Sequence, residues 1–232
     1  MAIGAVPSVL PHWYDHWLSS VKSDFKRRAI DTVPAGECAS AALRRSREES
    51  ELQKLYRTLN ALRHSSEAMM HAESEAEYLS VVCQIITRDC GHAMVWIGYA
   101  ENDEHKTIRP VAHAGFDAGY LETLQLTWVD TERGRGPTGT AIRTGQPDVC
   151  RNMLTDPRFA PWREEAGKRG YGASLVIPLQ TNSHTFGAIT IYASQPESFR
   201  EDEIKLLAEL ADDLAYGITA LRLREAHARA LP

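Results

Sequence analysis

The sequence predicts an α+β domain in which long helices flank an antiparallel β-sheet. Segments near both ends repeat apolar residues at alternating intervals of three and four, as long amphipathic helices do. Between them lie two pairs of short apolar segments, each pair joined by a polar loop in the pattern of a β-hairpin. Strands joined by such short loops pair antiparallel, because a parallel pair needs a crossover of a dozen or more residues.

Length and charge narrow the class of protein. The 232 residues allow one large domain or one domain with extensions. A net charge of −5 excludes the basic surface expected of a general nucleic-acid-binding protein. No apolar run approaches the ~20 residues of a transmembrane helix, and residues 1–21 lack the charged start and apolar stretch of a signal peptide. We therefore expect a cytoplasmic protein with neither a nucleic-acid nor a membrane partner.

The N-terminal part divides into an extension and a long helix. Residues 1–38 resemble nothing else in the chain, and a short amphipathic helix is expected there from the spacing of Trp13, Tyr14, Trp17, Leu18 and Val21. Residues 39–72 are expected to form an uninterrupted helix, since they contain neither Gly nor Pro. Alternating intervals of three and four, typical of a coiled-coil seam, separate Leu52, Leu55, Leu59, Leu62, Ser66 and Met69.

Two further helices are expected. One runs from Ser74 to Asp89, because Ser74 and Glu77 form a capping box at its start and Gly91 ends it. The other covers residues 200–232 and begins with an acidic turn that suits the helix dipole. The same seam spacing recurs there in Ile204, Leu207, Ala211, Leu214, Ile218 and Leu221. A monomer would have to bury or expose two seams, so we expect a homodimer that pairs through the terminal helices.

The strands fall within a core domain, residues 73–199. Residues 94–99 and 107–114 flank a polar loop and are expected to form one hairpin. Residues 174–180 and 185–193 are expected to form a second. The glycine-rich segment between the hairpins is too long for a simple connection, and long loops in compact domains usually carry function.

One run within this segment, residues 134–147, carries the most information. It opens with G-x-G-x-x-G, but Pro137 removes a backbone N–H and the neighbouring strands form hairpins, so a dinucleotide-binding turn is not expected. The whole run, G-x-G-x-x-G-x-A-x-x-T-G-x-P, resembles the GAF domain of bacterial sensor proteins. The strand pair 174–179 and 186–189, and the start of the last helix at 199–203, match the same family.

This resemblance covers residues 59–221 and implies a GAF-like (profilin-like) fold. Such a fold has a six-stranded antiparallel sheet, with the N- and C-terminal helices packed on one face and a ligand pocket on the other. It also implies that residues 39–72 are a signalling helix, of the kind that links such domains to kinase or cyclase output modules.

The glycine-rich turn also predicts an anion site. Residues 136–139 bring the N-terminus of a helix to a tight turn, where unsatisfied N–H groups and the positive end of the dipole are exposed. Arg133 and Arg135 stand just before it. The alternative is a capped helix with solvated arginines.

Ligand pockets typically combine aromatic walls with a few polar groups. On that basis, the candidate ligand-binding residues are Trp96, Trp128, Asp130, Arg133, Arg135, Thr138, Asn152, Asp156, Trp162 and Tyr171. Each tryptophan has the alternative of being a core residue.

Signatures of catalysis and of cofactor binding are absent from the sequence. It has no motif of hydrolases, metalloproteases, P-loop proteins or kinases, so no catalytic residue is assigned. Cys90 and His92 could supply two metal ligands, but nothing supplies two more at a zinc-site spacing, so neither metal nor cofactor is expected. His113 is the candidate axial ligand for haem, against the alternative of an ordinary strand residue. Asn152 is followed by Met153, whereas cyclic-nucleotide-binding members have Lys there.

The sequence therefore predicts a non-catalytic domain that senses an unidentified small molecule and transmits its presence through a helical homodimer. A ligand-free dimerisation or protein-interaction module is the first alternative. The second is an enzyme like the free methionine sulfoxide reductases, which some GAF proteins resemble. Those enzymes place a cysteine inside the glycine-rich run, where this chain has Thr138.

Overall fold

The computed structural model describes residues 35–116, 119–182 and 184–230. The helix expected around Trp13 and Trp17 lies outside this part of the chain. The chain divides into two compact units, Met1–Ser50 and Glu51–Pro232. In the first unit the structure describes the beginning of helix α2 (Ala35–His71), where residues 43–50 are exposed. The second unit contains the sheet and its helices.

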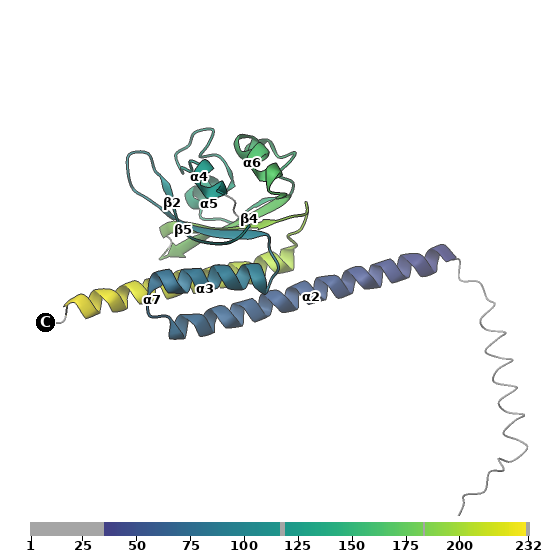
Figure 1. Ribbon diagram of the computed structural model, residues 1–232, viewed down its shortest axis with the longest axis horizontal. Coiled ribbons are helices and arrows are strands. Elements are labelled where there is room, and N and C mark those ends of the chain that lie inside the picture. Colours follow the sequence, from purple (N-terminus) through teal and green to yellow (C-terminus); the bar gives the residue numbers. More distant parts are fainter. Residues whose placement is uncertain (1–34, 117–118, 183, 231–232) are drawn as a thin grey trace, which may run out of the picture. The chain divides into compact units, whose positions relative to one another are not determined.

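Within the described residues, five antiparallel strands form one sheet in the order β2-β1-β5-β4-β3 (Figure 1). The strands are β1 (Met94–Ala100), β2 (Ile108–Gly115), β3 (Asp148–Cys150), β4 (Ala173–Thr181) and β5 (His184–Ala193). Both hairpins expected from the sequence are confirmed, as β1 with β2 and β4 with β5. The central pairing of β1 with β5 joins the two hairpins into one sheet.

The expectation of six strands is wrong, because the segment before the glycine-rich turn does not form a ladder. It pairs with the residue just before β2 as one isolated bridge, between Thr127 and Thr107. Gln125, two residues earlier, has φ 42°. This left-handed conformation interrupts the extended backbone that a strand requires.

Short helices between β2 and β4 cover one face of the sheet (Figure 1). They are α4 (Tyr120–Thr123), α5 (Pro137–Thr144), the 3-10 helix η1 (Pro157–Trp162) and α6 (Arg163–Lys168). Helix α5 packs on β4 and β5. The aromatic and aliphatic side chains under these helices form a buried cluster with the sheet residues Trp96, Val176 and Tyr192.

Long helices cover the opposite face of the sheet, as expected (Figure 1). Helix α3 (Glu75–Arg88) begins at Ser74, whose hydroxyl accepts a 3.3 Å hydrogen bond from the Glu77 N–H, so the predicted N-cap is confirmed. Helix α7 (Glu201–Ala230) lies along β4. Together with the end of α2 they bury the sheet residues Ile189 and Ile191.

The seam predicted in the last helix is buried within the domain itself. Leu207, Leu214 and Leu221 belong to the cluster of side chains between the helices and the sheet. The 3-4 spacing therefore marks the face of α7 that packs on its own sheet. A heptad pattern and an amphipathic helix that packs on a sheet share this spacing, so the sequence alone did not separate them.

The second half of α2 runs parallel to α7. Ser66 Oγ lies 3.2 Å from Asp213 Oδ2, and the Arg224 guanidinium donates to the Ala72 carbonyl at 2.6 Å. The sequence separation is 147 and 152 residues in these two contacts, and a nearly constant separation is the signature of parallel helices. The buried side chains in this half of α2 are small: Thr58, Ala61 and Ser65. Ala72, which follows the helix, is buried as well.

The seam predicted on α2 is therefore only partly buried. Leu62 and Met69 pack against the core, whereas Leu52 is 69% and Leu59 is 52% exposed. Among the described helices, none has a stretch that is both long and apolar enough to span a bilayer.

Candidate ligand-binding site

A small cavity lies on the face of the sheet that is covered by the short helices. Its volume is about 20 Å³, enough for roughly one water molecule. The lining residues come from α4, the glycine-rich turn, α5, η1 and the facing sides of β4 and β5: Tyr120, Leu124, Leu126, Thr127, Arg133, Gly136, Pro137, Thr138, Gly139, Phe159, Trp162, Ser174, Val176, Thr190 and Tyr192.

The N-terminus of α5 faces this cavity without a side-chain cap. Its N-cap residue is Gly136, and Pro137 occupies the first helical position, where a missing N–H costs nothing. The amides of Thr138 and Gly139 come too early in the helix to reach a carbonyl four residues before them within it. Both residues line the cavity.

Trp162 explains why the N-cap residue is glycine. A Cβ at Gly136 would lie 2.4 Å from two ring carbons of Trp162, far inside van der Waals contact. The indole is fixed in this position by a 3.1 Å hydrogen bond from its Nε1 to the Leu124 carbonyl. The ring therefore takes the space of a capping side chain and closes one side of the cavity.

Hydroxyl groups from the sheet reach the cavity floor. Thr138 Oγ1 on α5 and Thr190 Oγ1 on β5 lie 3.4 Å apart. Ser174 on β4 is 1% exposed, and its hydroxyl has no hydrogen-bond partner within the described residues. Since buried polar groups are nearly always satisfied, the Ser174 hydroxyl indicates a place for a missing partner.

Tyrosine side chains fill the space beside the cavity. The rings of Tyr171 and Tyr192 stack with centroids 4.8 Å apart, and both meet the Tyr120 ring edge-on at 5.4 and 5.7 Å. Burial raises the pKa of the Tyr120 phenol above its ordinary value. These neutral aromatic groups give the cavity walls of low polarity.

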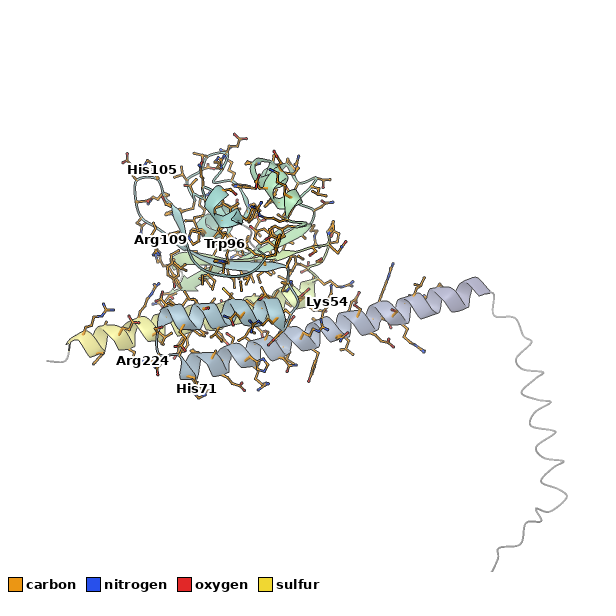
Figure 2. All side chains as sticks on the ribbon, in the orientation of Figure 1. Lys54, His71, Trp96, His105, Arg109 and Arg224 are labelled. Carbon is orange, nitrogen blue, oxygen red and sulfur yellow. The ribbon has the colours of Figure 1, made fainter. Side chains whose placement is uncertain are left out.

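Three of the candidate residues predicted from the sequence line the cavity: Arg133, Thr138 and Trp162. Two others lie behind its walls. Trp96 is fully buried on the same side of the sheet, with Nε1 3.4 Å from the Tyr192 hydroxyl (Figure 2). Tyr171 packs behind Tyr192 and donates a hydrogen bond to the Phe116 carbonyl.

The other five candidates lie outside the cavity lining. Trp128 donates to the Glu101 carbonyl at 3.0 Å and lies under the Lys106 ammonium. Asp130 and Arg135 form an exposed ion pair at 2.8 Å. The last two, Asn152 and Asp156, line an open groove next to Arg158.

Several cavity residues were not anticipated. Ser174 and Thr190 are polar residues inside otherwise apolar strands, and that pattern was the available signal. Tyr192 stands two residues after Thr190 and therefore on the same face of β5, as strand periodicity requires. Tyr120 and Leu124 come from a segment whose path depends on tertiary contacts, so the sequence offered no signal for them.

The described thiols stand apart from the cavity. Cys83, Cys90 and Cys150 are free and do not line it. Desolvation by burial raises the pKa of each to about 12, so the reactive thiolate is scarce at neutral pH. Among the described residues no group of three or more His, Cys, Asp or Glu side chains could hold a metal ion.

Comparisons with known proteins agree with this architecture. The family model for the GAF domain matches residues 72–219. A GAF domain from a Coxiella burnetii phosphoenolpyruvate-protein phosphotransferase has a TM-score of 0.62 at 21% identity, covering 74% of this chain and 98% of that one. Comparison with curated protein sequences gave no match.

Two other solved structures show the range of proteins that share the fold. A free methionine-R-sulfoxide reductase from Neisseria meningitidis, in complex with its substrate, has a TM-score of 0.61 at 17% identity, covering 72% of this chain and 91% of that one. The GAF domain of A. aeolicus nlh2, in an inactive state, has a TM-score of 0.56 at 18% identity, covering 73% and 99%. The family model matches more than half of the residues of this chain, and the chain therefore belongs to the GAF domain family.

Proposed function

We propose that this chain is a non-catalytic regulatory GAF domain that senses a small molecule and transmits its presence through a helical homodimer. The observation that carries the proposal is the position of β5 between the cavity and the long helices. Thr190 and Tyr192 line the cavity, while Ile189 and Ile191 on the other face of the strand belong to the core under α3 and α7.

Successive side chains of β5 point to opposite faces of the sheet, so this strand links the cavity to the long helices. A ligand that enlarges the 20 Å³ cavity must displace the side chains around it, and a closely packed core transmits such a shift to its other face. Signalling requires that the ligand bind two arrangements of the helices with different affinity. A ligand with equal affinity for both would change nothing.

The dimer surface we propose is the exposed side of α2. Its apolar residues in the second compact unit are Leu52, Tyr56, Leu59 and Met70. The first three are separated by four and three residues, which is the spacing of a coiled-coil seam. The corresponding seam of α7 is buried in the domain, so α2 supplies the exposed contact. A kinase or cyclase module is the output partner we propose.

Native mass spectrometry of the purified chain, followed by denaturing extraction of anything bound, tests the proposal. We expect a dimer that carries a stoichiometric small molecule. An empty dimer would favour the alternative, a module for dimerisation or protein interaction alone. An empty monomer would contradict both.

A reductase is the second candidate function, because free methionine-R-sulfoxide reductases are among the similar structures. The positions of the described thiols argue against it. Attacking and resolving sulfurs must meet, whereas Cys83 lies in the core under the long helices and Cys150 lies in β3 on the short-helix side. Turnover of free methionine sulfoxide by the purified chain, lost on replacing a cysteine, would establish this activity instead.

A further inference from the structure

We propose that the ligand carries a carboxylate, which binds at the N-terminus of α5 between Ser174 and Arg133. This inference rests on the proposed sensory function and names the chemical class of its ligand. The walls of the cavity are aromatic and aliphatic, so they suit a small organic acid whose apolar body enlarges the 20 Å³ cavity as it binds. Three independent features of the cavity lead to the carboxylate.

The first feature is the uncapped helix end. An N-cap side chain normally accepts hydrogen bonds from the first amides of a helix, but Gly136 has none and Trp162 occupies its space. The amides of Thr138 and Gly139 lie at the end of the helix that carries the partial positive charge of the dipole. An acceptor in the cavity would supply the missing cap.

The second feature is the unpartnered hydroxyl of Ser174. It lines the same cavity from the opposite side, on β4, and its residue is 1% exposed. Leaving such a group without a partner is costly, and a hydroxyl can donate to a carboxylate oxygen. The helix amides and this donor therefore converge on one small space from two different elements.

The third feature is charge. Among the described residues that line the cavity, Arg133 alone is charged. It donates to the Leu124 carbonyl at 3.5 Å, a long contact that leaves most of the guanidinium's five donors for an anion. Arg135, two residues along the same turn, is committed to Asp130 at 2.8 Å and lies outside the lining.

Acetate, acetamide and inorganic phosphate serve as probes, titrated against the full chain while the amide signals of Thr138 and Gly139 are followed by NMR. We expect saturable shifts with acetate, and at least about tenfold weaker binding in both Ser174→Ala and Arg133→Gln, since a hydrogen bond to a charged group contributes on that scale. The matched control Arg135→Gln is expected to bind acetate as the unaltered chain does. Ser174→Ala removes an unpartnered group, so the variant should fold.

The outcomes separate this inference from the sensory function. Equal binding of acetamide, or tighter binding of phosphate than of acetate, would overturn the carboxylate assignment. A small molecule of another class recovered by extraction, with no acetate binding, would overturn the assignment and leave the sensor in place. No extracted molecule and no binding of any probe would contradict both.

Discussion

At the scale of single residues, the helix side of the domain buries a polar pair, His92 and Glu203. The Nε2 and Oε1 atoms lie 3.5 Å apart, and the side chains are 7% and 6% exposed. His92 stacks on Phe199 with ring centroids 5.4 Å apart. Burial lowers the pKa of His92 to about 4 and raises the pKa of Glu203, and the nearby charge of Lys54 lowers both. Burial therefore disfavours the charged form of both groups.

This pair predicts a pH-dependent stability. The pKa of His92 is about 4 in the folded chain, against an ordinary value of 6.5, so its contribution is present above pH 6.5 and is lost as the pH falls through 4. A shift of this size corresponds to on the order of 3 kcal/mol. Glu203 acts in the opposite sense, since its raised pKa favours the folded chain at low pH. We expect His92→Gln to lose less stability than the unaltered chain between pH 7 and 4.5.

Urea unfolding at several pH values measures this difference. The surroundings include Cys90, whose thiol lies close enough for Glu203 to raise its pKa, so Cys90 must be kept in every variant. Substitution of the exposed His113 by Gln is the matched control and should leave the pH dependence unchanged. An identical loss in His92→Gln and in the unaltered chain would show that His92 does not contribute.

At the scale of elements, the glycine-rich turn is held together by backbone contacts that exclude a side chain. A Cβ at Gly139 would lie 2.2 Å from the Gly134 carbonyl oxygen and 2.9 Å from the Thr127 carbonyl oxygen. Arg143, one turn later in α5, donates to the carbonyls of Gly134 and Trp128 and closes the same loop. The GAF motif of the sequence is thus a packing requirement of this turn.

Substitution of Gly139 tests that requirement. We expect Gly139→Ala to destabilise the domain by about 3 kcal/mol or more, because the clash is with backbone and cannot be relieved by a rotamer change. Gly167→Ala in α6 is the control: nothing lies within 4 Å of its Cβ position, and alanine is favoured over glycine in a helix. Thermal unfolding of both variants measures the difference in stability. Equal unfolding midpoints for the two variants would refute the packing argument.

At the scale of the whole molecule, association depends on which helix faces remain exposed. The apolar face of α7 is used inside the domain, whereas α2 exposes Leu52 and Leu59. A patch of this kind commonly marks an interaction surface. The polar pair Arg63 and Glu67, an exposed i,i+4 ion pair on the same helix, follows the apolar part.

Charge at this surface should prevent the proposed dimer. We expect Leu52→Glu combined with Leu59→Glu to give a monomer with unchanged secondary structure, because two apolar contacts become like charges that face each other across the two-fold axis. Leu154→Glu is the control, since Leu154 is similarly exposed, at 52%, but lies outside α2, in the turn between β3 and η1. Sedimentation of each variant at several protein concentrations measures whether it is a monomer or a dimer. A dimer that survives the double substitution would place the interface elsewhere.

The sequence anticipated local structure better than the site. The Ser74 cap, the two hairpins and the long terminal helices follow from hydrogen bonding, β-propensity and apolar spacing over a few residues. Of the candidate ligand-binding residues, three line the cavity: Arg133 just before the glycine-rich turn, Thr138 in α5 and Trp162 in η1. Trp128 and Asp130 precede the glycine-rich turn but lie outside the cavity lining: Trp128 donates to the carbonyl of Glu101, 27 residues earlier, and Asp130 pairs with Arg135.

By itself, the sequence determined the type of each main element, the hairpin pairing and the family to which the chain belongs, because these depend on periodicity and on a turn motif read over short distances. Tertiary structure alone decided that the α7 seam packs inside the domain, that a sixth strand is reduced to one bridge at Thr127, and that Ser174 meets the N-terminus of α5. The physical reason is that a repeat of three and four residues fixes which side chains share a helix face. The surface that covers this face is set by the packing of distant segments.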